Sequence, residues 1–181
     1  MEKISCLLCN SEENSPLFVA RDPDHITRDY YQVVKCKFCG CIYTNPRPIR
    51  EEISRFYYER YYGQMATYSG LFFEPLNLFF INRRVKRIER FKDRGRVLDI
   101  GCGQGRFLRA LMRRNFEVFV IEPYGFEDKR LNILKGELRE GLFEDSSFDL
   151  ITLWHVLEHI HDPLKTLFVI IIIIIIILGN Y

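Results

Sequence analysis

A glycine-rich turn between two apolar segments is the feature that most constrains how this chain can fold. Residues 97–105 read VLDIGCGQG, a short run suited to a buried strand followed by three glycines at alternate positions. The next residues, RFLRALMRR, have helical periodicity, and FEVFVIE at 116–122 is rich in β-branched and aromatic residues that favour strands. Strand, glycine turn, helix and strand in this order predict a βαβ unit.

Glu122 ends the second predicted strand, 17 residues past Gly105. A carboxylate at this position can accept hydrogen bonds from both ribose hydroxyls of a nucleoside, and the glycines let the backbone approach a ligand closely. The G-x-G-x-G spacing differs from the G-x-G-x-x-G of dinucleotide-binding proteins, and Asp99 lies two positions before the first glycine. These features favour a nucleoside ligand without a pyrophosphate.

The residues after Glu122 extend the βαβ unit to a parallel α/β sheet. We expect a short helix around 125–132, strands at 133–135 and 148–154, and a further helix that begins at Asp162-Pro163. Upstream, the apolar spacing predicts helices over 49–62 and 79–91, the second ended by Gly95. The basic residues of the second helix are interpreted as a solvated polar face, with phosphate binding as the less favoured alternative.

The C-terminal stretch contains eight consecutive isoleucines at 170–177, within an apolar run of twelve residues. This run is shorter than the roughly 18–20 residues that a membrane-spanning helix needs. A helix packed on a sheet shows polar positions in every turn, and a run of one β-branched residue shows none. We therefore interpret residues 167–181 as an Ile-rich low-complexity tail produced by a frameshift, by slippage or by truncation of the reading frame.

Two cysteine pairs predict a metal site near the N-terminus. Cys6 and Cys9 form one Cys-x-x-Cys pair, Cys36 and Cys39 form a second, and 26 residues separate the two pairs. Four thiolates complete the tetrahedral shell of a zinc ion, so we expect structural rather than catalytic zinc. Gly40 lets the backbone turn so that amide groups approach the sulfur atoms. Free buried cysteines and a redox dithiol are the alternatives.

These motifs together resemble the class I S-adenosylmethionine-dependent methyltransferases. LDIGCGQGRF is similar to their first motif, IEP to their second-strand acid, and FDLITLWHVLEHIHDP to their fourth-strand segment, so the resemblance covers residues 96–166. The cysteine pairs, the TNPRP segment and a Tyr-rich helix resemble the zinc-ribbon leader of a bacterial subgroup that includes sugar methyltransferases. The resemblance implies a Rossmann-like parallel sheet, S-adenosylmethionine as cofactor, and a small metabolite or sugar as methyl acceptor.

The resemblance also implies a set of cofactor-binding residues at the carboxyl ends of the strands. The glycine loop would line the cofactor, Asp99 would orient its methionine end, and Glu122 would hold the ribose. The residues after the third strand would border the adenine, and those at the mouth of the fourth would face the methyl donor. The full set is Asp99, Gly101, Cys102, Gly103, Gly105, Glu122, Glu137, Leu138, Trp154 and His155.

Two histidines are candidate catalytic bases. His155 and His159 follow the carboxyl end of the fourth strand, and imidazole titrates near neutral pH. A packing role is an equal alternative for each. The segment His155-x-x-Glu158-His159 also matches the H-x-x-E-H pattern of inverted zinc peptidases, which need this motif on a long helix.

The bulk composition gives no strong electric field that would indicate a charged partner. A formal net charge of +2 and a pI near 8.2 predict no nucleic-acid partner, although zinc-ribbon nucleic-acid binding stays as an alternative function. The start MEKISCLLCN has no secretory pattern, so we expect a cytoplasmic protein without a membrane span. A truncated, inactive cofactor-binding remnant is a further alternative, because the family has three more strands. The predicted division is a zinc ribbon at 1–45, a helical linker at 46–94, a partial α/β domain at 95–166 and the tail at 167–181.

Overall fold

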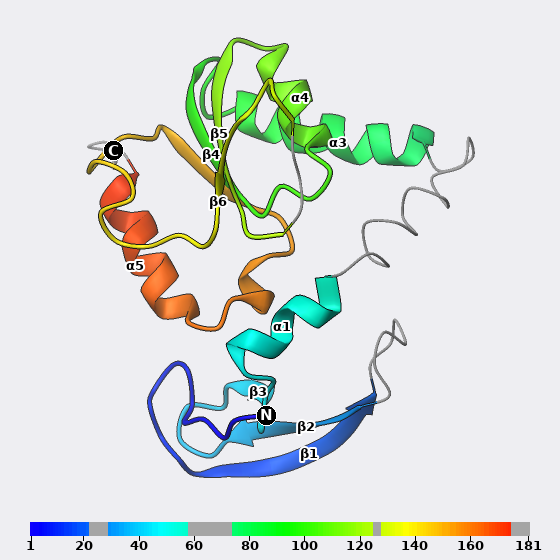
Figure 1. Ribbon diagram of the computed structural model, residues 1–181, viewed down its shortest axis with the longest axis vertical. Helices are drawn as coiled ribbons and strands as arrows, with labels where there is room; N and C mark the ends of the chain where they lie inside the picture. The colour runs from blue at the N-terminus through cyan, green and yellow to red at the C-terminus, as the bar shows by residue number, and fades with distance from the viewer. Residues whose placement is uncertain (22–28, 58–73, 125–127, 175–181) are drawn as a thin grey trace. The chain divides into compact units, whose positions relative to one another are not determined.

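The chain folds into two compact units, each with its own sheet. The computed structural model describes residues 1–21, 29–57, 74–124 and 128–174. We name Met1–Ala66 the ribbon unit and Thr67–Tyr181 the sheet unit. The first contains a three-stranded sheet and the second a four-stranded sheet; Figure 1 shows the two units.

The ribbon unit is built on an antiparallel sheet with the strand order β1-β2-β3. Its strands are β1 (Asn14–Arg21), β2 (Tyr30–Cys36) and β3 (Ile42–Thr44). The core is small and consists of two cysteines with Val34 and Tyr43. A module with so little buried apolar surface needs a further source of stability, such as a bound metal.

Helix α1 (Arg50–Tyr57) follows this sheet in the sequence. Glu51 and Glu52 lie in its first turn, as expected from the favourable interaction of acids with the positive end of a helix dipole. Glu52 also accepts a hydrogen bond of 3.1 Å from the backbone N–H of Ile49. The rest of the helix predicted over 49–62, from residue 58 onward, lies outside the described residues.

The sheet unit contains a fully parallel sheet with the strand order β6-β5-β4-β7. The strands are β4 (Gly95–Ile100), β5 (Phe116–Glu122), β6 (Asn132–Lys135) and β7 (Leu150–Leu153). Helix α4 (Arg106–Met112) connects β4 to β5. This arrangement confirms the predicted α/β class with a Rossmann-like parallel sheet.

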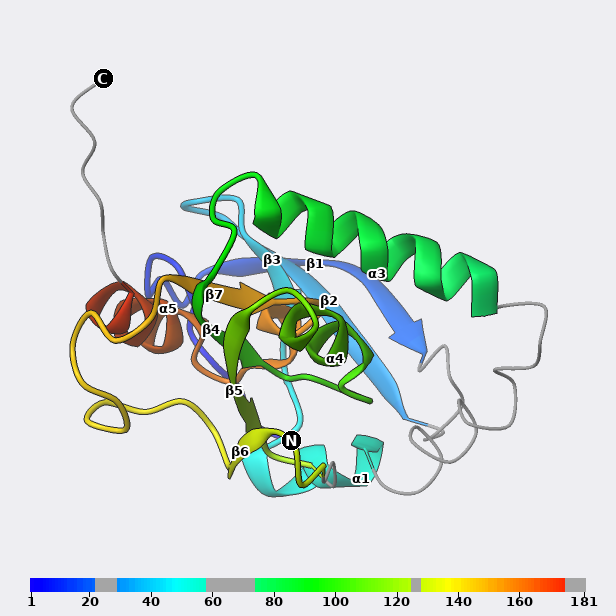
Figure 2. The same cartoon turned by 90° about the horizontal axis from the view of Figure 1, so that it is seen from above.

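Helices cover both faces of this sheet (Figure 2). Helix α3 (Glu74–Glu89) and helix α4 share one face, where Val85, Ile88 and Leu108 pack with β4 and β5. Helix α5 (Pro163–Ile173) covers the other face, where Val169 and Ile173 pack with residues of the same two strands. Successive residues of a strand point to opposite faces, so the apolar residues of β4 and β5 contribute to both cores.

Helix α5 differs from the predicted low-complexity tail. Its N-cap Asp162 accepts a hydrogen bond from the backbone N–H of Lys165, as expected, but the helix continues through the first four isoleucines. Ile173 is 3 % exposed in the core. Burial against the sheet outweighs the modest helix penalty of β-branched side chains. Residues 175–177 of the isoleucine run lie outside the described residues, and no helix within the described ranges has the length and apolar character needed to cross a membrane.

Three further predictions differ from the structure. Residues 128–131 of the helix expected at 125–132 form a turn, because Asp128 accepts a hydrogen bond from the backbone N–H of Arg130; residues 125–127 lie outside the described residues. Helix α3 ends at Glu89, and Gly95 begins β4 instead of ending the helix. The linker expected at 46–94 is shared between the two units, because α3 packs into the core of the sheet unit.

We predict that Phe148 is a main stabilising residue of the sheet unit. Its ring is fully buried and lies 5.4 Å from the Phe119 ring and 4.8 Å from the Phe143 ring, both edge to face. Phe148→Ala should lower the free energy of unfolding by about 3–5 kcal/mol in urea denaturation. The matched control is Phe168→Ala on α5, where the ring is 57 % exposed and the expected change is within about 0.5 kcal/mol. Equal losses in the two variants would contradict this view of the core.

Candidate functional site

The glycine loop lies against the carboxyl end of β5. The backbone N–H of Gly101 donates to the carbonyl of Ile121 at 2.8 Å, and the N–H of Gly103 donates to Glu122 Oε2 at 3.2 Å. Glu122 is 4 % exposed, and its other oxygen accepts from the N–H of Tyr124 at 3.1 Å. The loop and the acid, which the sequence could only place in order along the chain, are therefore in direct contact.

The glycines of the loop serve different structural needs. Gly101, Gly103 and Gly105 all have left-handed backbone conformations, with φ of 74°, 54° and 65°. A Cβ on Gly101 would lie 2.4 Å from Val156, so this position has no room for a side chain. A Cβ on Gly103 would meet no described atom within 4 Å. The backbone of Gly103 therefore borders free space beside the Glu122 carboxylate, a place that a ligand can occupy.

Cys102 belongs to the same contact network. Its thiol donates to Glu122 Oε2 at 3.7 Å. Burial raises the pKa of Cys102, and the charges of Glu122 and Asp99 raise it further. Cys102 is thus held as a neutral thiol at the acid, not as a reactive thiolate.

Asp99 is a buried residue of β4, two positions before the first glycine of the loop. It is 2 % exposed and accepts a hydrogen bond from the hydroxyl of Thr152 on the neighbouring strand β7. Burial raises the pKa of Asp99 from 3.8 to about 7, against the opposing effects of the Thr152 hydrogen bond and the Arg84 charge. Asp99 therefore connects strand β4 to its neighbour β7 in addition to any role toward a ligand.

Arg84 and Thr152 are site residues that the sequence did not reveal. The Arg84 guanidinium of α3 lies 4.5 Å from the ring centroid of Trp154, and Phe107 packs against the same ring at 5.7 Å, edge to face. The buried Trp154 Nε1 has no hydrogen-bond partner among the described residues. Trp154 is thus held in place directly after β7, and its Nε1–H group is unpaired among the described residues.

The two candidate bases lie on an exposed turn after β7. His155 has a left-handed backbone with φ of 58°, and its Nδ1 lies 3.7 Å from Glu158 Oε1. His159 ends a short 3₁₀ helix, η1 (Leu157–His159), and is exposed. A non-glycine residue held at positive φ next to a strand end is a feature that concentrates at functional sites. The H-x-x-E-H segment does not form the α-helix that a peptidase motif requires.

Glu137 and Leu138 follow strand β6, which pairs with β5 so that Lys135 is opposite Glu122. The N–H of Gly136 donates to the Glu122 carbonyl at 3.3 Å, which brings the start of this segment to the edge where the acid lies. Leu138 packs partly buried with the core cluster under α5, and Glu137 is exposed. Of the pair, Glu137 is thus the more accessible to a ligand.

The four predicted zinc ligands converge in the ribbon unit. The sulfur atoms of Cys6, Cys9, Cys36 and Cys39 all lie within 4.8 Å of one another. The Cys6–Cys39 and Cys9–Cys36 sulfur pairs are each 3.5 Å apart. Bonds of about 2.3 Å in a tetrahedron correspond to sulfur separations of about 3.8 Å. The donor set and its spacing therefore fit a four-thiolate zinc site.

The backbone around the cysteine pairs has the same form twice. The carbonyl of Cys6 accepts from Asn10 N–H at 2.9 Å, and that of Cys36 accepts from Gly40 N–H at 3.1 Å. Asn10 and Gly40 are both left-handed, with φ of 62° and 77°. The sequence predicted this turn at Gly40 but not at Asn10, although asparagine is among the residues that tolerate it best.

The turn at the second pair also favours the charged form of a sulfur ligand. Backbone hydrogen bonds from Cys39 and from Phe38 lower the pKa of Cys36 to about 6, although burial acts in the opposite direction. Amide groups directed at a sulfur stabilise the thiolate, which is the form that binds zinc.

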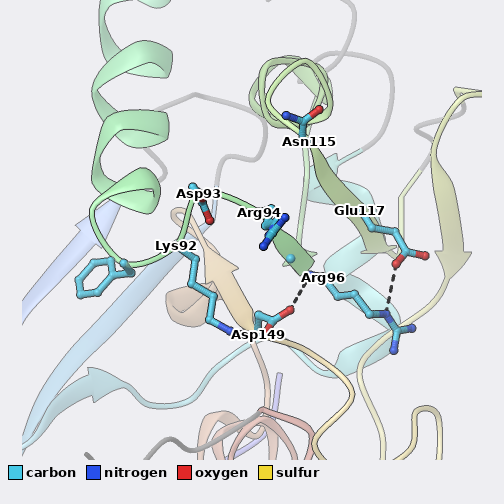
Figure 3. Close-up of a pocket in the computed structure, with 9 residues that line it drawn as sticks. Lys92, Asp93, Arg94, Arg96, Asn115, Glu117 and Asp149 are labelled. Atoms are coloured by element: carbon cyan, nitrogen blue, oxygen red, sulfur yellow. Dashed lines mark hydrogen bonds and ion pairs between the residues drawn. The ribbon is translucent and has the colours of Figure 1, made fainter.

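A groove of about 610 Å³ lies at the opposite edge of the sheet, where β4 and β5 begin (Figure 3). Lys92 pairs with Asp149, and Arg96 pairs with Glu117 at 3.5 Å. The groove contains no residue of the predicted site. It is separate from the glycine loop, which is at the carboxyl ends of the same strands.

Two solved structures are similar to this fold. A proposed S-adenosyl-L-methionine-dependent methyltransferase of Methanococcus maripaludis is 21 % identical, with a TM-score of 0.52 over 64 % of this chain and 58 % of that protein. The 1,6-didemethyltoxoflavin-N1-methyltransferase of Burkholderia thailandensis, solved with 1,6-didemethyltoxoflavin and S-adenosylhomocysteine, is 14 % identical, with a TM-score of 0.51 over 88 % of this chain and 68 % of that protein. The fold is thus the Rossmann-like methyltransferase fold.

Family membership follows from the sequence of the sheet unit. Residues 76–170, more than half of the chain, match the methyltransferase domain family. The chain belongs to this family. A comparison with curated proteins found no match. The chain spans 58 % of the length of the Methanococcus protein.

The buried carboxyl of Asp99 predicts a pH dependence of stability. Because folding raises its pKa from 3.8 to about 7, the protonated carboxyl favours the folded state. This contribution is fully present below about pH 4 and is lost as the pH rises through about 7. Between these values the unfolding temperature of the wild type should fall relative to that of Asp99→Asn, by at least several degrees. Asp93→Asn, an exposed aspartate, is the control, and parallel curves for wild type and Asp99→Asn would contradict the prediction.

Proposed function

We propose that this chain is an S-adenosylmethionine-dependent methyltransferase that acts on a small metabolite or a sugar-like acceptor and holds a structural zinc ion. The observation that carries the proposal is the contact between Gly103 N–H and Glu122, with free space in front of the glycine. Backbone without a side chain next to an acid at the end of the second strand is the arrangement that an adenosyl ligand requires.

In this proposal each loop residue has a defined task. Glu122 accepts hydrogen bonds from the ribose hydroxyls, and Gly101, Cys102, Gly103 and Gly105 form the surface under the ligand. Asp99 acts as a positioning residue for the methionine end through its bond to Thr152. Trp154 and His155 border the methyl donor. Glu137 and Leu138 border the adenine.

When bound, S-adenosylmethionine supplies an electrophilic methyl group on a sulfonium sulfur. The contribution of the protein is then mainly the alignment of donor and acceptor, and a base is needed when the acceptor loses a proton. His155 or His159 takes that proton in this proposal. His155 is the better situated of the two, because it lies directly after the end of β7, with its Nδ1 3.7 Å from Glu158 Oε1.

The acceptor class rests on the sequence resemblance of the ribbon unit to the leader found on sugar methyltransferases. The Burkholderia protein with the same fold methylates a small heterocycle, 1,6-didemethyltoxoflavin, so the fold accommodates small acceptors. A formal net charge of +2 gives no general field for a polyanionic acceptor.

The zinc ion has a structural role in this proposal. Cys6, Cys9, Cys36 and Cys39 provide four thiolates, which leaves no open coordination position for catalysis. The metal would supply folding free energy to a unit whose apolar core is small.

Calorimetric titration with S-adenosylmethionine tests the cofactor site. Glu122→Gln should weaken binding by on the order of 10- to 100-fold, because a charged acceptor is lost. Gly103→Ala should weaken binding and lower the free energy of unfolding by only about 1–2 kcal/mol, the cost of alanine at positive φ, since its Cβ meets no described atom. Glu117→Gln, an exposed acid on the same strand, is the matched control. No heat with wild type at millimolar ligand, or wild-type affinity in Gly103→Ala, would reject the proposed site.

Metal analysis of the purified chain tests the zinc site independently. We expect about one zinc ion per chain, and well under half of that in Cys9→Ser and in Cys39→Ser. Cys41→Ser keeps the four ligands and should retain the metal. Wild-type protein with less than about half an equivalent, or equal zinc in Cys9→Ser and Cys41→Ser, would be evidence against four-thiolate binding.

A further inference from the structure

Helix α3 presents a regular stripe of side chains on the face opposite to its buried residues. We name Leu76, Phe79, Phe80, Arg83, Arg87 and Arg90 the α3 stripe. The first five recur at intervals of three and four positions and so lie on one side of the helix, and Arg90 follows in the turn directly after its last residue. All six are exposed, whereas Val85 and Ile88 on the other side are buried in the core. The stripe is thus an outer surface of the sheet unit.

The basic half of the stripe carries positive charge that no neighbour compensates. Residues 74–117 contain 12 Lys and Arg against 5 Asp and Glu, a net charge of +7 in a chain whose total is +2. Within the described ranges, Arg83, Arg87 and Arg90 have no ion pair or hydrogen bond from their side chains. Three exposed, unpaired guanidinium groups in a row form a local site for a partner with several negative charges.

Other cations near the α3 stripe form ion pairs with acidic residues. Arg106 pairs with Glu74 at 2.7 Å and Arg114 with Glu89 at 2.8 Å, which joins α4 and the turn after it to α3. In the groove of Figure 3, Lys92 and Arg96 are neutralised by Asp149 and Glu117. Within the described ranges, no such ion pair is formed by the three arginines of the α3 stripe.

The other half of the stripe is apolar and equally accessible. Leu76, Phe79 and Phe80 are 51 %, 57 % and 49 % exposed, and the two phenylalanine rings contact each other edge to face at 5.6 Å. Adjacent large apolar side chains on one surface point to an interaction partner rather than to bulk water. This partner must therefore offer apolar volume next to negative charge.

We infer that the α3 stripe binds the surface of an anionic lipid bilayer. Arginines bind phospholipid headgroups, while leucine and phenylalanine side chains enter the boundary between headgroups and acyl chains. A nucleic acid also satisfies the arginines through its phosphates, and its unpaired bases stack on aromatic rings. Leu76 and the edge-to-face packing of Phe79 on Phe80 favour acyl chains over flat bases. The inference is independent of the glycine loop, which lies at the carboxyl edge of the sheet.

Co-sedimentation with vesicles tests this inference on the full chain. Wild type should bind vesicles of phosphatidylcholine with phosphatidylglycerol, bind vesicles of phosphatidylcholine alone far more weakly, and be released by high salt. The triple variant Arg83→Gln, Arg87→Gln, Arg90→Gln should lose on the order of 100-fold in apparent affinity. The double variant Phe79→Ser, Phe80→Ser should also bind more weakly, and this loss should be the same at low and at high salt.

The control removes three exposed charges elsewhere in the sheet unit, in the combined variant Lys129→Gln, Arg139→Gln, Lys165→Gln. It should keep wild-type binding. Only variants whose unfolding temperature matches that of wild type are compared. Equal binding to neutral vesicles, equal losses in the control and in the arginine variant, or unchanged binding in the phenylalanine variant would overturn the inference. Tighter binding to single-stranded RNA than to anionic vesicles would also overturn it.

Discussion

The hydrogen bond between Gly103 N–H and the Glu122 carboxylate is the interaction on which the site depends. A buried carboxylate is costly unless its oxygens have donors, and here the loop supplies Gly103 N–H and the Cys102 thiol, while Tyr124 N–H supplies a third. The acid thus holds the loop in place while the loop stabilises the acid. The core below fixes both partners, since β4 and β5 pair in register from Gly95 to Ile100.

The sequence alone was sufficient to predict the elements that are specified by local residue patterns. The apolar runs of β4 and β5, the cap at Asp162 and the spacing of the cysteine pairs were all correctly interpreted. The failures occurred where tertiary contacts decide. The isoleucine run has no amphipathic period of its own, and its helical state follows from the burial of Ile173 against the sheet. The turn at Asp128 is a local exception, because its side chain accepts a hydrogen bond from the N–H of Arg130, two residues on, and this bond competes with helix formation.

The candidate site shows the same division. Gly101 to Gly105 and Glu122 could be found because the motif orders them along the chain. Arg84 and Thr152 could not, because each reaches the site from an element distant in sequence: Thr152 bonds to Asp99 across strands, and Arg84 stacks on Trp154 from α3. The elevated pKa of Asp99 is likewise a product of burial, which a sequence pattern does not report.

The isoleucines of α5 give this helix an unusual tolerance to changes in length. Thr166, Val169 and Ile173 are its buried positions, and the cap at Asp162 sets the register from the N-terminal side. A codon gained or lost within the repeat would still leave isoleucine at 173, because residues 170–177 are all isoleucine. Replication slippage, to which such repeats are prone, would therefore be nearly silent for the packing of this layer.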